Sequence, residues 1–299
     1  MTLVKKVLIR ELGEIGMIIN HNIAALRAFR YGKQISAQQM KVMTQLSSGL
    51  RINSAADDAA GLAISERMRA QIRGLNQASR NAQDGISLIQ TAEGAANEVH
   101  SILNRIRELA VQSANGTYTD EERNNMQFEV DELLKEIGNI SKNTEFNKMS
   151  LLDGTTNNDG TDNNSRITLQ VGANKGQTME LEIGSLATNA LGINGISIAT
   201  AGDAQNAIDV IDEAVNRTSK TRSKLGAYQN RLEHTINNLE NQAENLTAAE
   251  SRIRDVDMAK AMMEYARLEI LSQANIFIQM QSIKQGERVL ALLKSLEGS

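Results

Sequence analysis

The feature that most constrains this chain is a pair of long rows of apolar side chains, each spaced seven residues apart. One row follows the tract at about 57–115 and the other runs from about 204 to 253. A seven-residue repeat forms a continuous stripe on a helix, and the stripe must be buried against another helix. We therefore predict two long helices packed antiparallel. The rows are Met68, Leu75, Ala82, Ile89, Ala96, Leu103 and Ala110, and then Ala204, Ile211, Thr218, Leu225, Leu232, Leu239, Leu246 and Ile253.

The composition fits long helices and argues against several functions. None of the 299 residues is proline, which would break or kink a helix interior. The chain also lacks cysteine, so disulfides, thiolate chemistry and zinc–sulfur sites are excluded. The three histidines are scattered and lack a metal-ligand spacing. With a net charge of −4 and no basic stripe, we expect no nucleic-acid binding. Because no apolar run approaches the roughly 18 residues of a membrane span, we expect no membrane insertion, and we predict no cofactor.

Shorter patterns complete the predicted fold. A helix is expected at about 20–46, and another at about 120–141 with a capping box formed by Thr119 and Glu122. Two alternating runs around a Gly/Asn turn predict a β-hairpin at 166–183. The heptad register breaks near 250–256, where a hinge or a change of helix partner is expected. The predicted fold class is mainly α, a long antiparallel helical bundle or coiled coil with a small β-hairpin insert.

The stretch SSGLRINSAADDAAGLAIS at 47–65 offers two interpretations. Asp57 and Asp58 could act as an acid/base pair, which would make the chain an enzyme. Neighbouring residues on a helix point about 100° apart, however, so the two carboxylates would not face each other. The favoured interpretation is that both acids lie in the first turn of a helix, where the helix dipole stabilises them, with Asn53 or Ser54 as the cap.

On that interpretation, residues 47–56 connect two helical domains and are not an active site. Gly49 would allow the first helix to stop. Arg51 would bridge to a neighbouring segment or subunit instead of binding a substrate. The resulting prediction is a hinge formed by Gly49, Arg51, Asn53, Asp57 and Asp58.

Four long stretches resemble bacterial flagellin, and the resemblance is strong over about residues 17–275. The matches are nearly collinear, which makes the resemblance specific. They are INHNIAAL at 19–26, LSSGLRINSAADDAAGLAISERMRAQIRGLNQASRNAQDGISLIQTAEGA at 46–95, RIRELAVQSANGT at 105–117, and LGAYQNRLEHTINNLENQAENLTAAESRIRDVDMAKAMMEYARLEILSQA at 225–274.

The resemblance implies a structural subunit of the bacterial flagellar filament that self-assembles into a helical tube for swimming motility. It implies an inner coiled-coil domain from residues 17–46 and 254–299, a spoke at 47–56, and a rod-like domain at 57–253. Only about 142–203 separate the two halves, so we expect a short, two-domain flagellin without outer variable domains. The residues expected to form the inner tube are Ile23, Leu26, Val256, Met263, Ile270 and Phe277.

The resemblance also implies a location and partners. We expect a secreted, extracellular protein that leaves through the flagellar export apparatus without a cleaved signal peptide. The expected partners are further copies of the chain, the flagellar export chaperone, the filament cap protein and the hook–filament junction proteins. The Toll-like flagellin receptor of animal innate immunity is expected to recognise Arg105, Leu109 and Glu129.

Two departures from the family pattern keep alternatives open. Residues 1–16 precede the usual start near Met17, and we expect them to reflect a mis-set start codon. The tail from Ile276 onward is bulkier than the usual ending of the family, and overpacking of close helices destabilises them. The alternatives are a hook–filament junction protein or a flagellin paralogue that does not polymerise.

Overall fold

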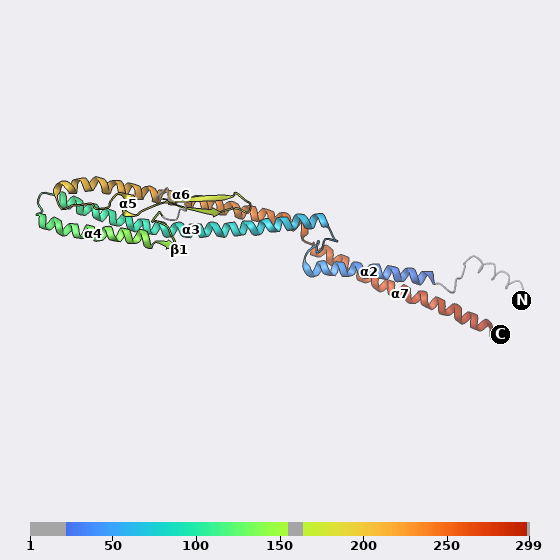
Figure 1. Cartoon of the computed structure of the whole chain (residues 1–299). Helices are drawn as coiled ribbons and strands as arrows, with labels where there is room; N and C mark the ends of the chain where they lie inside the picture. The colour runs from blue at the N-terminus through green and yellow to red at the C-terminus, as the bar shows by residue number, and fades with distance from the viewer. Residues whose placement is uncertain (1–21, 155–163, 298–299) are drawn as a thin grey trace. The chain divides into compact units, whose positions relative to one another are not determined.

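The computed structural model describes residues 22–154 and 164–297, and the predicted extra segment at 1–16 lies outside them. By its internal contacts the chain divides into two units. The terminal unit contains the chain up to Glu66 and from Glu250 onward, and the central unit is Arg67–Ala249. Helices dominate both units, and the described strands form two antiparallel pairs (Figure 1). The predicted fold class is therefore confirmed, whereas the predicted roles of the domains remain predictions.

Two long helices form most of the central unit, α3 (Ala59–Ala114) and α6 (Ala201–Arg254), with α4 (Asp120–Asn143) alongside (Figure 1). Their direction is antiparallel, because Arg107 pairs with Asp212 at 2.6 Å and Arg222 pairs with Glu93 at 3.3 Å. Every member of the two predicted rows from Leu75 to Ala110 and from Ala204 to Leu239 is buried. The seven-residue stripes thus form the core of this unit.

The insert between α4 and α6 contains the predicted hairpin, formed by β3 (Asn164–Gln170) and β4 (Thr178–Gly184). Met179, Leu181 and Ile183 of β4 alternate into the core. Glycines let the hairpin approach α3 closely. A Cβ at Gly74 would lie 2.9 Å from the Cβ of Ala173, closer than real Cβ contacts come. The insert therefore packs as a layer against the long helices.

Sequence patterns did not predict two short elements. One is a strand pair, β1 (Glu145–Phe146) with β2 (Met149–Ser150), and the other is the single turn of α5 (Thr188–Leu191). The turn of the pair contains Asn147 and Lys148, both with positive φ, of 50° and 64°. Glycine usually marks such left-handed turns, so a turn without glycine gave no signal.

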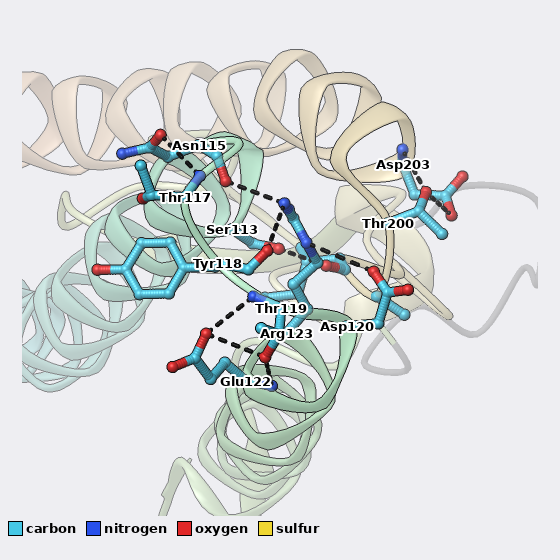
Figure 2. Close-up of polar contacts among 12 residues, drawn as sticks. Ser113, Asn115, Thr117, Tyr118, Thr119, Asp120, Glu122, Arg123, Thr200 and Asp203 are labelled. Carbon is cyan, nitrogen blue, oxygen red and sulfur yellow. Dashed lines mark hydrogen bonds and ion pairs between the residues drawn. The ribbon is translucent and has the colours of Figure 1, made fainter.

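The turn between α3 and α4 is fixed by one buried arginine (Figure 2). Thr119 and Glu122 form the predicted capping box at the start of α4. The Arg123 side chain, which is 5% exposed, donates from Nη2 to the carbonyl oxygens of Asn115 at 2.9 Å and Tyr118 at 3.2 Å. Arg123 thereby sets where α4 begins relative to the end of α3.

We expect Arg123→Met to lower the free energy of unfolding by about 2 kcal/mol, because both carbonyls lose a charged donor in a largely buried site. Urea unfolding followed by circular dichroism measures this change. The control is Lys135→Met on the same helix. The ion pair of Lys135 with Glu132 is exposed on both sides, so its loss should cost at most about 0.5 kcal/mol. Equal effects of the two substitutions would contradict the assigned role of Arg123.

Candidate functional site

The terminal unit is built on two helices, α2 (Ile23–Ser48) and α7 (Met258–Glu297), held together by polar contacts. Asn22 Nδ2 donates to the carbonyl of Ser282 at 3.0 Å, and Gln279 Nε2 donates to the carbonyl of Ala28 at 3.2 Å. The residue numbers of the contacts rise along α2 as they fall along α7, so the two helices are antiparallel. Side-chain amides that bond to the opposite backbone fix the register, because a slipped pairing would leave them unsatisfied.

The seam between α2 and α7 is lined by small and polar residues and by one large apolar residue, Leu268. A Cβ at Gly32 would lie 2.5 Å from Asn275 Nδ2, so the two helices approach closely at this point. The buried positions of α7 are spaced by seven, and they are Ala261, Leu268, Asn275 and Ser282. Large side chains do not fit at such a close approach. Most of the large apolar residues of α7 therefore point elsewhere.

The seven-spaced row from Val256 that the sequence pattern picked out does not face α2. Val256 is half-buried, but Met263 and Ile270 are each 67% exposed and Phe277 is 66% exposed. These residues lie half a helix circumference from the seam. Ile23 and Leu26 of α2 are also exposed, at 47% and 50%. Their role in an inner tube stays a prediction, but their side chains are available for contacts outside the chain.

Apolar side chains surround α7 instead of forming one stripe. Besides the row opposite the seam, exposed apolar residues of this helix include Met262, Leu271, Ile276, Ile278, Met280 and Ile283. A helix with large apolar residues on several of its sides is normally buried against more than one neighbour. Isolated apolar residues are common on protein surfaces, but a contiguous set of this size marks an interaction surface. The terminal unit therefore presents a surface that fits further protein.

At the joint, the end of α2 pairs with the segment that precedes α7. Gly49 ends α2 in the left-handed conformation, with φ of 71°, as expected for a glycine at this position. Its carbonyl accepts a hydrogen bond from Val256 N at 3.0 Å. Leu50 and Asp255 form an antiparallel bridge beside it. Residues about 200 positions apart in sequence are thus joined through their backbones.

Arg51 is part of the same joint. Its backbone N–H donates to the carbonyl of Arg254 at 2.6 Å, and its guanidinium donates to the carbonyl of Ile253 at 2.5 Å. Arg254 in turn pairs with Glu66 of α3 at 2.9 Å, and its side chain is only 10% exposed. In the structure Arg51 thus binds a neighbouring segment, one of the two roles that the sequence indicated.

Asp57 organises the loop before α3. Its carboxylate pairs with Lys41 of α2 at 2.9 Å and accepts from the backbone N–H groups of Ser54 at 3.1 Å and Asn53 at 3.2 Å. Lys41, followed by the two N–H groups, lowers the pKa of Asp57 from 3.8 to about 2. A carboxylate held in its charged form by three partners is a structural anchor and a poor general acid.

The expected cap of α3 needs correction. Asp58, and neither Asn53 nor Ser54, caps the helix by accepting from Gly61 N at 2.9 Å. Asn53 instead donates from Nδ2 to Ser48 Oγ at 2.8 Å, near the end of α2. The helix begins only at Ala59, because the Asp57 carboxylate accepts a hydrogen bond from the backbone N–H of Ser54 in the preceding loop. The two adjacent acids therefore have different partners and do not form a pair.

For Asp57→Asn, we expect a loss of stability that depends on pH. A pKa that is lower in the folded state contributes stability above the ordinary carboxyl value of 3.8, and this contribution is lost as the pH falls toward about 2. The wild-type chain should therefore unfold at higher urea than the variant at neutral pH. The difference should shrink as the pH drops below about 4. A difference that stays constant down to pH 2 would contradict this account of the anchor.

The three residues that the resemblance assigned to receptor recognition have different exposures. Arg105 of α3 pairs with Glu129 of α4 at 2.8 Å, and this hydrogen bond is the main cause that raises the pKa of Arg105. Both side chains are about half exposed. Leu109 is only 2% exposed and belongs to the core. The structure thus brings Arg105 and Glu129 together at the surface and places Leu109 beneath it, where it cannot serve as an exposed apolar anchor.

These features define a helical structural protein with a folded scaffold and an uncovered apolar surface. In the described ranges, no helix is long and apolar enough to cross a membrane. Two family models match the chain. Residues 19–157 match the bacterial flagellin N-terminal helical region, and 208–293 match the bacterial flagellin C-terminal helical region. The chain belongs to the bacterial flagellin family.

Individual relatives agree with the family models. A flagellin of Halalkalibacterium halodurans is 54% identical over 280 residues, which covers 93% of this chain and 100% of that protein. A flagellar filament 31.3 kDa core protein of Treponema maltophilum is 47% identical, with the same shares covered. Flagellins are structural proteins, so the prediction that the chain is not an enzyme is confirmed.

A solved structure of a putative flagellar hook-associated protein from Vibrio parahaemolyticus shares the fold. Its TM-score is 0.56, and the match covers 67% of this chain and 100% of that one. The sequences are only 15% identical, so this likeness shows the fold alone. It does not distinguish a filament subunit from a junction protein.

Proposed function

We propose that this chain is the subunit of a flagellar filament and that it self-assembles into a helical tube used for swimming. The observation that carries the proposal is the apolar surface around α7, where Met263, Ile270 and Phe277 are each about two-thirds exposed. Full burial of one large apolar side chain contributes about 1.5–3 kcal/mol. A lone subunit leaves this free energy unused, and a filament would recover it.

The mechanism is growth by addition of further copies. The exposed row of α7 points away from α2 and is free to meet another copy. In a filament, a second copy would meet this row with a different part of its own surface, because a row that pairs with itself closes into a dimer. Contacts between unlike patches are heterologous, and repeated heterologous contacts that do not close build an open helical filament. The central unit would enter as a folded scaffold, and ordering of the terminal helices would be coupled to their burial.

The proposal includes the location and partners implied by the family. The chain would leave the cell through the flagellar export apparatus without a cleaved signal peptide and join the filament outside. An export chaperone would shield the apolar surface of α7 before assembly, because an exposed surface of this kind promotes aggregation. A cap protein would guide insertion at the tip, and hook–filament junction proteins would anchor the first subunits.

Complementation tests the proposed role in the cell. The chain is expressed in a bacterium deleted for its own flagellin, and filaments are examined by electron microscopy together with swimming in soft agar. Filaments many cell lengths long and restored swimming are expected. A junction protein would instead leave hooks without long filaments. A non-polymerising paralogue would be secreted with no filament at all, and either result would refute the proposal.

Recognition by the Toll-like flagellin receptor is a second proposal, and it rests on the exposed ion pair between Arg105 and Glu129. Arginine is enriched among the few residues that account for most of the binding free energy of an interface. Leu109 would contribute from beneath, by holding α3 in place.

For Arg105→Glu, we expect receptor binding at least about 30-fold weaker, which corresponds to a hot spot of about 2 kcal/mol. Binding of the purified chain to the receptor ectodomain measures this change. Arg107→Glu is the matched control, because Arg107 is similarly exposed but pairs with Asp212 of α6. Equal losses in both variants would contradict a specific role for Arg105.

A further inference from the structure

The exposed apolar surface of the terminal unit is rich in methionine. The chain has 12 methionines and no cysteine. All of those described in α2 and α7 are about half exposed or more, whereas Met179 in the core of the central unit is 2% exposed. The exposed set is Met40 at 63%, Met43 at 53%, Met258 at 47%, Met262 at 57%, Met263 at 67% and Met280 at 51%.

Four of these methionines share one face of the α2–α7 pair. Phe29 of α2 and Ile283 of α7 line the same groove, of about 350 Å³, so they lie on the same face of the helix pair. At about 100° per residue, Met40 lies within about 20° of Phe29 on α2, and Met258 lies within about 20° of Ile283 on α7. Met43 follows Met40 by three residues and Met262 follows Met258 by four, which keeps each pair on one side of its helix. We call Met40, Met43, Met258 and Met262 the methionine face.

The four residues also lie within about two helical turns of one another along the pair. The bridge between Leu50 and Asp255 sets the antiparallel register at the joint. In that register, Met43 stands across from the turn that contains Met262, and the end of α2 stands across from Met258. The methionine face is thus one compact patch next to the joint, and each of its four residues is about half exposed or more in the single chain.

We propose that the methionine face is a site of reversible two-electron oxidation that blocks addition of the subunit to a filament. The proposal rests on the proposed assembly through the exposed surfaces of α2 and α7. The oxidant class is a peroxide. The thioether sulfur attacks one oxygen of hydrogen peroxide, and an S–O bond forms as the O–O bond breaks. The transferred oxygen gives its proton to the second oxygen, which leaves as water. The sulfur is oxidised to the sulfoxide by the same two electrons that reduce the peroxide.

A sulfoxide has the opposite effect of a thioether on an assembling surface. The thioether is apolar and adaptable, which suits close packing against a neighbour. The sulfoxide carries a strong hydrogen-bond acceptor that must lose water when it is buried, and burial without a partner is unfavourable. A dithiol used by a sulfoxide reductase reverses the change, because it is oxidised to a disulfide while the oxygen leaves as water. Subunits that are already assembled would be protected.

The first measurement concerns selectivity and does not require assembly. Purified full chain is treated with hydrogen peroxide, and sulfoxide formation at each methionine is followed by peptide mass spectrometry. The four methionines of the face should oxidise at least 10-fold faster than Met179, which serves as the buried internal reference. Equal rates at Met179 and at the face would overturn the proposal.

The second measurement concerns seeded growth. Wild-type chain oxidised at the face should add to seeds at least 10-fold more slowly than the same chain untreated. Reductase with dithiothreitol should restore the rate. A variant carrying Met40→Leu, Met43→Leu, Met258→Leu and Met262→Leu keeps apolar side chains of similar volume. Every chain in this measurement, including the one called wild type, also carries Met263→Leu and Met280→Leu, because these two exposed methionines of α7 lie outside the face. The growth rate of the four-leucine variant should change less than two-fold on peroxide treatment.

The outcomes separate this inference from the proposed function. If untreated wild-type chain does not grow on seeds, the proposed function fails. If it grows, but the chain with sulfoxide at the face grows equally fast, the inference alone is overturned. A four-leucine variant that peroxide slows as strongly as wild type would also overturn it, because the effect would then come from other residues. The four-leucine variant could fail to grow on seeds even without peroxide. In that case the reductase experiment decides, and oxidised wild-type chain whose growth the reductase does not restore would contradict the inference.

Discussion

Replacement of Ile270 by glutamate is expected to slow seeded filament growth at least about 100-fold, a change of about 2.8 kcal/mol. Ile270 is 67% exposed on the side of α7 that points away from α2, so the proposed assembly would bury it against another copy. A carboxylate at that position would have to lose its water or push the neighbouring subunit away. Growth is measured as filament length on seeds by electron microscopy, at equal concentrations of wild-type and variant chain.

Ile270→Leu serves as the matched control, because it keeps an apolar side chain of the same volume at the same position. Its growth rate should remain within a few-fold of wild type. Circular dichroism should show equal helix content in both variants, because the side chain makes little contact within its own chain. Normal growth of the glutamate variant would show that this side of α7 is not an assembly surface.

The second large effect is expected in the central unit, where Leu103→Ala should lower the free energy of unfolding by about 3 kcal/mol. Leu103 of α3 is fully buried in the core shared by α3, α4 and α6. Removal of a buried leucine side chain loses its apolar burial and leaves a cavity that the surrounding helices fill only in part. Urea unfolding followed by circular dichroism measures the change.

Val111→Ala on the same helix is the control for that experiment. Val111 is 49% exposed, so its truncation should cost no more than about 0.5 kcal/mol. Similar losses for Leu103→Ala and Val111→Ala would contradict the assignment of the predicted heptad row to the core.

The sequence predicted the central unit well because burial in long helices imposes a period of its own. Leu75 through Ala110 and Ala204 through Leu239 were recognised from their seven-residue spacing alone, and the structure buries all of them. The hairpin was recognised by alternation, and the capping box of α4 by the spacing of Thr119 and Glu122. In each case a local sequence pattern reflects the contacts that its residues make in the folded chain.

The terminal unit was harder to predict because its apolar pattern does not describe the contacts within one chain. Leu268 is the one large apolar residue among the buried seam positions of α7, which otherwise are small or polar, such as Asn275 and Ser282. The seam therefore escapes a search for large apolar rows. The row of Met263, Ile270 and Phe277 is real, but it faces away from α2. Periodicity identifies a surface to be buried and cannot say which chain buries it.

The candidate recognition and hinge residues show a similar limit. Resemblance selected Arg105, Leu109 and Glu129, yet only the structure shows that the leucine is buried beneath the ion pair. The adjacent acids at the joint lie just before α3 and not in its first turn, so that prediction was wrong. Their separate partners, Lys41 for Asp57 and Gly61 for Asp58, depend on how the loop folds back.

Seeded polymerisation of the purified full-length chain tests the central claim most directly. Monomeric chain is added to short filament fragments, and their lengths are followed by electron microscopy. The proposed function predicts steady elongation into helical tubes at a rate proportional to the concentration of free chain. Seeds that stay at their initial length, in the presence of folded monomer, would contradict the claim that this chain is a filament subunit.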